Sequence, residues 1–264
     1  MPLEFQTYPT VAEAAHAARQ PGAAYLGGGT LLVRRANEGD LSFDRYVRTR
    51  DPRLGRVEVS GNRVTLGASV TLARIAADPR FAVIAPAARS VGGPAIRNMA
   101  TIGGNLFAPS PYGDFATTLL ALDASVTLGE RNLPIEEFLL GRDACADLVT
   151  DISFDLPASG SFRFAKVSRV KPKGVSVLSI AALIRVGDTG TVTSARVALG
   201  AMADRPVLAA AASAALVGVP LTAQGIAPAV AAIGQDTDPQ TDAIASAWYR
   251  AEVLPVHFRR LLLA

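Results

Sequence analysis

Cysteine and histidine are almost absent from this chain of 264 residues, which has one cysteine, Cys145, and two histidines, His16 and His257. A single cysteine excludes an internal disulfide, and so few soft ligands argue against a metal or iron–sulfur site. We therefore expect any metal chemistry to belong to a partner. Both histidines fall in stretches with helical patterns, where structural roles are the rule, and no Ser-His-Asp or paired-carboxylate set is evident.

Long apolar runs are missing as well. Although 50% of the residues are apolar, no window approaches the roughly 18 uninterrupted apolar residues of a membrane span. The best run, residues 175–184, contains Ser176 and Ser179 and predicts a buried strand. Near the amino terminus, Glu4 stands where a secretory signal carries basic charge, so we expect a cytoplasmic protein with no membrane span.

A strong net charge is the third absence, since the formal value is only +3. The three lysines, Lys166, Lys171 and Lys173, lie within eight residues and are interleaved with Arg163 and Arg169. A solvated strand and turn is the ordinary explanation, and contact with an anionic ligand or a partner subunit is the functional alternative. Nucleic-acid binding is disfavoured because no aromatic residues are interleaved with these charges.

What the chain does have is two glycine-rich stretches that each carry threonine. The first, Gly27-Gly28-Gly29-Thr30, follows a short apolar run and precedes a helical pattern that starts at Leu31. This arrangement can present free backbone N–H groups to a phosphate. It matches neither the Rossmann GxGxxG spacing nor a P-loop, and by itself it is a weak signal.

The second stretch is Thr101-Ile102-Gly103-Gly104-Asn105, followed by the sequence SPYGD that ends at Asp114. Paired glycines let a backbone approach a bulky ligand because no Cβ blocks the way, and the flanking hydroxyl and amide can bond that ligand. The prolines before Asp114 predict irregular chain, and Asp114 is expected to cap the helix that follows. We therefore predict a ligand-facing loop, against the alternative of a glycine turn without a ligand.

Hydrophobic patterns predict a mixed α+β chain. Residues 56–59 and 64–68 alternate around a Ser-Gly-Asn turn and predict a β-hairpin. The small, polar stretch 157–161 is the best candidate for a domain boundary. Beyond it we expect an antiparallel sheet of three strands and then helices, the last of them kinked or broken at Pro255. The three strands are placed at residues 161–168, 175–186 and 192–199.

A ligand long enough to touch both glycine stretches would account for both, and a dinucleotide is the natural candidate. The chain carries, in this order, the motifs GGGT, GGPAIRNMATIGGNL with SPYGD, FAKVSR with SVLSIAAL, ARVALGAMADRPVLA and SAWYR. This order of motifs resembles that of the FAD-binding medium subunit of the molybdenum hydroxylases. That family includes xanthine, carbon monoxide and aldehyde dehydrogenase types. The resemblance covers essentially the whole chain. IRNxATIGGNL with SPxxD is specific, whereas GGGT is not.

The resemblance implies an α+β fold with FAD in a cleft between two subdomains. The FAD-binding domain, of the PCMH/vanillyl-alcohol-oxidase type, would span residues 1–158, with subdomains of about 1–55 and 56–158. A smaller C-terminal flavoprotein domain with a three-stranded antiparallel sheet and helices would span residues 161–264. The resemblance also implies two partners in a heterotrimer, a large molybdopterin-binding subunit and a small subunit with [2Fe-2S] clusters.

Position by position, the resemblance implies two groups of FAD contacts and no catalytic or metal-binding residue. The first pyrophosphate loop comprises Leu26, Gly27, Gly28, Gly29, Thr30 and Leu31. The second loop comprises Thr101, Ile102, Gly103, Gly104 and Asn105. Asp114 matches an acidic residue that contacts FAD, and Leu148 falls on the adenine side. Lys166 falls at the flavin ring end, where a cation would favour the negative charge that reduction brings.

The leading hypothesis is an oxidoreductase subunit that carries electrons from partner iron–sulfur clusters to a terminal acceptor. The acceptor is left open among NAD, dioxygen, quinone and a carrier protein. The alternative is a self-sufficient FAD-dependent oxidase or reductase of the same flavin-domain superfamily, but neither a large substrate domain nor a protein base is evident. Tyr112 stays open between covering the flavin edge and packing as a surface aromatic.

Overall fold

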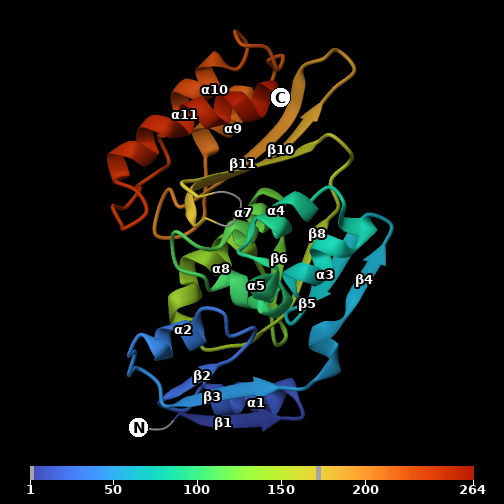
Figure 1. The fold of residues 1–264 in the computed structure, drawn as a ribbon. Coiled ribbons are helices and arrows are strands. Elements are labelled where there is room, and N and C mark those ends of the chain that lie inside the picture. Colours follow the sequence, from blue (N-terminus) through green and yellow to red (C-terminus); the bar gives the residue numbers. More distant parts are fainter. Residues whose placement is uncertain (1–2, 171–173) are drawn as a thin grey trace.

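The computed structural model describes residues 3–170 and 174–264, which form three successive parts (Figure 1). Lys171 and Lys173, singled out in the sequence, lie outside the described residues. Each part is built on its own sheet. No helix within the described ranges combines the length and apolar character needed to cross a bilayer.

The N-terminal part is a small parallel sheet with a helix packed on it. Its elements are β1 (Glu4–Tyr8), α1 (Val11–Ala18), β2 (Ala23–Tyr25), α2 (Leu32–Asn37), β3 (Arg45–Thr49) and the 3-10 helix η1 (Pro52–Gly55). The strand order is β1-β3-β2, and both neighbours run parallel to β3. Helix α1 begins with a capping box, in which the Thr10 hydroxyl accepts from the Glu13 N–H and the Glu13 carboxylate accepts from the Thr10 N–H.

The middle part is a five-stranded antiparallel sheet covered by helices. Its strands are β4 (Val57–Ser60), β5 (Arg63–Gly67), β6 (Ser125–Leu128), β7 (Arg131–Pro134) and β8 (Val149–Asp155), in the order β4-β5-β8-β6-β7. Its helices are α3 (Leu72–Ala77), η2 (Pro79–Phe81), α4 (Ala85–Ser90), α5 (Pro94–Met99), α6 (Ile102–Leu106), α7 (Asp114–Ala121), α8 (Ile135–Gly141) and η3 (Arg142–Ala144). The predicted hairpin is β4 and β5, which turn at Gly61 with φ +61°.

The stretch that was expected to be a ligand-facing loop contains the short helices α5 and α6, and the chain is irregular only between α6 and α7, where the prolines predicted it. Pro94 opens α5 at a position where its missing N–H costs nothing, and the Thr101 hydroxyl caps α6 by accepting from Gly104 N–H at 3.1 Å. The expectation that Asp114 caps α7 was wrong. Gly113, at φ +96°, occupies the cap position, and Asp114 is the first helical residue.

The C-terminal part is an antiparallel sheet with helices on one side. Its elements are β9 (Phe162–Ser168), β10 (Ser176–Val186), β11 (Val192–Gly200), β12 (Val207–Leu208), α9 (Ala210–Leu216), α10 (Ala227–Ala232) and α11 (Ala247–Leu263). The two-residue strand β12 makes this a sheet of four strands rather than three, in the order β12-β11-β10-β9. Of the kink or break expected at Pro255, the break does not occur, because α11 continues through that residue.

Strand β10 joins the middle and C-terminal parts because both of its faces are buried. Leu178 and Ile180 belong to the core under the C-terminal helices, whereas Ala181 belongs to the core of the middle part. This double burial explains the nearly continuous apolar run at residues 175–184. It also places the start of β10 beside α7, where Ser176 bonds to Asp114.

Candidate functional site

The two glycine-rich stretches meet in space. A Cβ built on Gly28 would lie 1.9 Å from the carbonyl oxygen of Met99, and one built on Gly104 would lie 3.9 Å from the Gly28 nitrogen. A Cβ built on Gly27 would lie 3.2 Å from Thr101 Oγ1. The first stretch therefore lies directly against the end of α5 and the start of α6, and only glycine permits the approach at position 28.

Backbone donors are free in the first stretch. Residues 27–30 lie between β2 and α2, and within the described part of the chain their N–H groups donate to no protein acceptor. Leu26, just before them, donates to the Val47 carbonyl at 2.7 Å, and Gly29 adopts φ +73°. A run of unpaired N–H groups on a glycine loop is a site for an anion such as a phosphate.

The second stretch has its donors already paired. The N–H groups of Ile102 and Gly103 donate to the carbonyls of Val70 and Ala68, at 2.9 and 3.0 Å. Those of Gly104 and Asn105 donate to Thr101, to its hydroxyl and its carbonyl respectively. This stretch is therefore a fixed wall without side chains, rather than a second set of free backbone donors.

A cavity of about 850 Å³ lies along these glycines, within the size range of ligand sites. Twelve of the residues that the sequence singled out line it. They are Gly27, Gly28, Gly29, Thr30, Leu31, Thr101, Gly103, Gly104, Asn105, Asp114, Leu148 and Lys166. Leu26 and Ile102 are outside this lining, and Ile102 lies fully buried in the core of the middle part.

The side chains expected to bond a ligand in the second stretch are partly engaged within the protein. The Asn105 amide oxygen accepts from the Ala116 N–H at 2.9 Å, which ties α6 to α7. Arg142, 5% exposed, donates to the Leu106 carbonyl at the end of α6 and to the Asp204 carbonyl in the C-terminal part. Burial lowers the pKa of the Arg142 guanidinium. These contacts tie α6 to α7 and to the C-terminal part.

One end of the cavity carries a buried ion pair. Lys166 Nζ donates to Asp114 Oδ2 at 2.8 Å and to the Ser90 carbonyl at 2.9 Å. The side chains of Lys166 and Asp114 are only 12% and 7% exposed. The cation predicted from the sequence is thus present, but the carboxylate beside it offsets its charge.

The other end of the cavity lies in the N-terminal part. Leu148 completes the small core of that part together with Ala14, Ala17 and Val47, and it lines the cavity as well. Tyr25 lines the same end, and burial raises the pKa of its hydroxyl to about 12. An apolar wall with a neutral phenol suits a flat, uncharged ring.

The cavity is also lined by residues that were not predicted as site residues, Arg34 and Ser176 among them. Arg34, on α2, donates to the Tyr112 hydroxyl at 2.8 Å, so the two side chains link the N-terminal part to the segment before α7. Tyr112 lines the cavity, and this contact holds its hydroxyl against α2. Ser176 donates to Asp114 at 2.6 Å. Its signal in the sequence was a hydroxyl inside an otherwise apolar strand.

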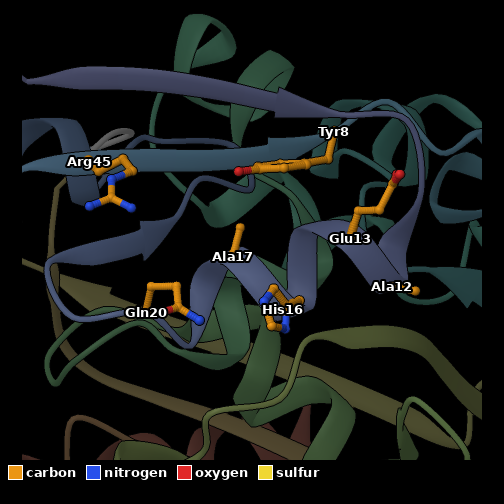
Figure 2. A pocket seen from close by; sticks show the side chains of 7 residues that line it. All are labelled: Tyr8, Ala12, Glu13, His16, Ala17, Gln20 and Arg45. Carbon is orange, nitrogen blue, oxygen red and sulfur yellow. The ribbon is translucent and has the colours of Figure 1, made fainter.

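A second hollow, of about 450 Å³, lies on the N-terminal part alone (Figure 2). It is lined by Tyr8, Ala12, Glu13, His16, Ala17, Gln20 and Arg45. The polar groups of Tyr8 and Glu13 are already bonded to Gln6 and Thr10. None of the predicted site residues borders this hollow, and the larger cavity is the better candidate.

The structure thus defines a class, a two-subdomain α+β binding protein with a glycine-walled cavity for an elongated ligand. A Cβ at position 28 would collide with the facing backbone, and the free N–H groups beside it suit a diphosphate, so the residues present fit a dinucleotide. No group of three or more metal-ligating side chains occurs among the described residues.

Comparisons with known proteins agree with this class. The family model for the FAD binding domain in molybdopterin dehydrogenase matches residues 3–157, and the CO dehydrogenase flavoprotein C-terminal domain matches residues 162–264. The nicotinate dehydrogenase FAD-subunit of Eubacterium barkeri is 29% identical over 255 residues, covering 90% of this chain and 86% of that subunit. The carbon monoxide dehydrogenase medium chain of Afipia carboxidovorans is 27% identical, covering 77% and 75%.

Solved structures show the same likeness. Carbon monoxide dehydrogenase from Hydrogenophaga pseudoflava aligns with a TM-score of 0.90 and 25% identity, covering 99% of this chain and 96% of that chain. Because the first family model spans more than half of the sequence, the chain belongs to the family of FAD-binding domains of molybdopterin dehydrogenases. The resemblance inferred from the motifs and the α+β fold that it implied are both confirmed.

Proposed function

We propose that this chain is the FAD-carrying electron-transfer subunit of a heteromeric molybdenum hydroxylase. Its partners would be a large molybdopterin-binding subunit and a small subunit with [2Fe-2S] clusters. When bound, FAD supplies the ability to take up two electrons and pass them on. The relatives named as FAD-subunit and medium chain support this assignment.

The observation that carries the proposal is the contact between the two glycine stretches at one wall of a single cavity. In this proposal the free N–H groups of residues 27–30 donate to the diphosphate. Gly103 and Gly104 supply a smooth surface for the middle of the ligand. Leu148 and Tyr25 border the adenine, and Lys166 and Asp114 border the flavin ring.

We also propose that the chain divides near residue 160, into an FAD-binding domain of residues 1–158 and a C-terminal domain of residues 161–264. The boundary would lie in the turn between β8 and β9, where Gly160 adopts φ +79° in open space. The matched ranges of the two family models, which end at residue 157 and begin at residue 162, support this division.

The direct test is the flavin content of the purified chain. Protein prepared with added FAD should be yellow, hold one FAD per chain, and release FAD intact on denaturation. The isolated chain should show no flavin reduction with candidate organic substrates, since the substrate site would lie in another subunit. Colourless protein from such a preparation would refute the proposal.

The test of the partners is co-purification. A tagged copy expressed at native abundance should bring down two further polypeptides together with molybdenum and iron, both measurable by elemental analysis. Recovery of the flavoprotein alone, with substrate-dependent reduction of its flavin, would instead identify a self-sufficient enzyme.

A further inference from the structure

A cluster of three side chains from three elements closes one end of the cavity. Asp114 starts α7, Lys166 lies on β9 and Ser176 starts β10. All three line the cavity. The Asp114 carboxylate is held on both oxygens, since Lys166 Nζ donates to Oδ2 at 2.8 Å and Ser176 Oγ donates to Oδ1 at 2.6 Å.

The donors in this cluster are almost fully accounted for. A lysine ammonium has three N–H donors. Two of those on Lys166 are taken by Asp114 and by the Ser90 carbonyl, which leaves one for a ligand. The serine hydroxyl has a single donor, and Ser176 gives it to Asp114. The geometry of the carboxylate therefore fixes where the last donor of Lys166 points.

Burial makes the serine contact matter. Ser176 is 1% exposed and Asp114 is 6% exposed, so little water can replace a lost hydrogen bond. Hydrogen bonds to an ionised acceptor are shorter and stronger than neutral ones, and their loss in a buried site is costly. A hydroxyl dipole that points its proton at Oδ1 also reduces the negative potential that Asp114 sends into the cavity.

We propose that Ser176 is a positioning residue for the flavin end of the site. It holds the Asp114 carboxylate against Lys166 and weakens the negative field of the pair, so that bound FAD is easier to reduce. This inference rests on the proposed function, because it requires FAD in the cavity. The role belongs to the hydroxyl of Ser176 and to no other property of β10.

The chain contains a matched control. Ser179 lies on the same strand, is fully buried, and stands directly across the β9–β10 ladder from Lys166. Unlike Ser176, its hydroxyl has no hydrogen-bond partner among the described residues. Replacing Ser179 removes a buried hydroxyl next to Lys166 without removing a donor to Asp114.

The experiment compares the midpoint potential of FAD bound to the full chain in Ser176→Ala, Ser176→Cys and Ser179→Ala, with FAD affinity measured in parallel by fluorescence. Ser176→Ala should shift the reduction equilibrium about tenfold toward oxidised FAD, or about 30 mV more negative for a two-electron couple. Ser176→Cys, which keeps a weak donor of similar size, should fall between this variant and the wild type. Ser179→Ala should match the wild type.

Two results would overturn the inference. Unchanged potentials in both Ser176 variants would remove the role of the hydroxyl. Equal shifts in Ser176→Ala and Ser179→Ala would assign the effect to general packing of β10. If Ser176→Ala does not fold, the Ser176→Cys comparison decides the question alone. Failure of the proposed function looks different, because the wild-type chain would then bind no FAD at all.

Discussion

The two glycine stretches resemble each other in sequence but differ in what their backbones offer. Residues 27–30 have N–H groups with no acceptor in the described part of the chain, whereas the N–H groups of Ile102, Gly103, Gly104 and Asn105 are all paired. The first stretch can therefore hold a ligand by donating hydrogen bonds. The second acts as a wall whose lack of side chains makes room.

The two stretches also differ in the size of the hydrophobic core beside them. The first belongs to the N-terminal part, whose buried cluster consists of Ala14, Ala17, Val47 and Leu148, and helix α2 beside it has no buried residue. The second belongs to a large core that includes Phe81, Phe115 and Phe154 and is braced by Arg142. A thinly cored region opens locally more readily than a large core. The backbone donors therefore lie in the part that is expected to open locally more readily, and the glycine wall lies in the part with the large core.

The largest effect is expected from Gly28→Ala. Its Cβ would lie 1.9 Å from the Met99 carbonyl oxygen, so the donor loop must move away from the wall. Strain of this kind costs about 3 kcal/mol, which corresponds to a loss of roughly 100-fold in FAD affinity. Fluorescence titration with FAD measures the change.

Gly234→Ala is the matched control for that experiment, because a Cβ there meets no atom within 4 Å. It should bind FAD like the wild type. Gly104→Ala is a milder variant, since its Cβ would lie 3.0 Å from the Thr101 hydroxyl. If Gly28→Ala bound FAD with wild-type affinity and circular dichroism showed native structure, contact between the two stretches would not be needed for FAD binding.

The next effect in size concerns the thin core. Leu148→Ala removes one member of the N-terminal cluster and should destabilise that part by about 2–3 kcal/mol. Amide exchange should then rise in β1, β2 and β3 more than in the middle part. Leu140→Ala, at a leucine that is 64% exposed, should change little. A uniform rise across the whole chain would mean that the two parts unfold as one unit.

A smaller effect is expected at alkaline pH. Burial raises the pKa of Tyr25 to about 12 in the folded state, above its value in an unfolded chain. The neutral hydroxyl therefore contributes stability that is complete below about pH 10 and is lost as the pH rises toward 12. At pH 11 the free energy of unfolding should be lower by about 1 kcal/mol, and the Tyr25→Phe variant should not show this decrease. Denaturant unfolding at pH 8 and pH 11 makes the comparison, and an identical fall in both proteins would contradict it.

The smallest effect should come from Tyr112→Phe, which removes the acceptor for Arg34 at the edge of the cavity. A partly exposed hydrogen bond contributes about 0.5–1 kcal/mol, so FAD release should become roughly two- to fivefold faster. Stopped-flow fluorescence measures this rate. The control is Tyr249→Phe, which lies on α11 outside the cavity lining. Equal release rates in the wild type and both variants would show that the contact between Arg34 and Tyr112 does not slow FAD release.

Local patterns predicted the local features of this molecule well. The hairpin turned at Gly61 and the antiparallel strands after residue 160 both follow from short sequence signals. Strand β3 was missed because its parallel partners are distant in sequence and its burial depends on them. The short helix α6 was missed because paired glycines disfavour helix, and its cap and its packing against Ala68 overrode that preference.

The sequence identified most residues of the candidate site, but it identified the role of each residue less well. The motifs supplied both glycine stretches and the family resemblance supplied Lys166, and all of them line one cavity, whereas the helix-cap role expected for Asp114 was wrong. That carboxylate instead bonds to residues on β9 and β10, contacts made through the fold that no local pattern reveals. Likewise, which glycine N–H groups are free depends on the acceptors at Val70 and Ala68, and sequence spacing does not show these.

Amide hydrogen exchange at the two glycine stretches, read by NMR with and without FAD, tests the central claim most directly. Without FAD, residues 27–30 should exchange freely and residues 102–105 should be protected. With FAD, residues 27–30 should become protected while residues 102–105 change little. Binding of FAD that leaves the amides of residues 27–30 unprotected would contradict the account, because the proposed donors would then be idle.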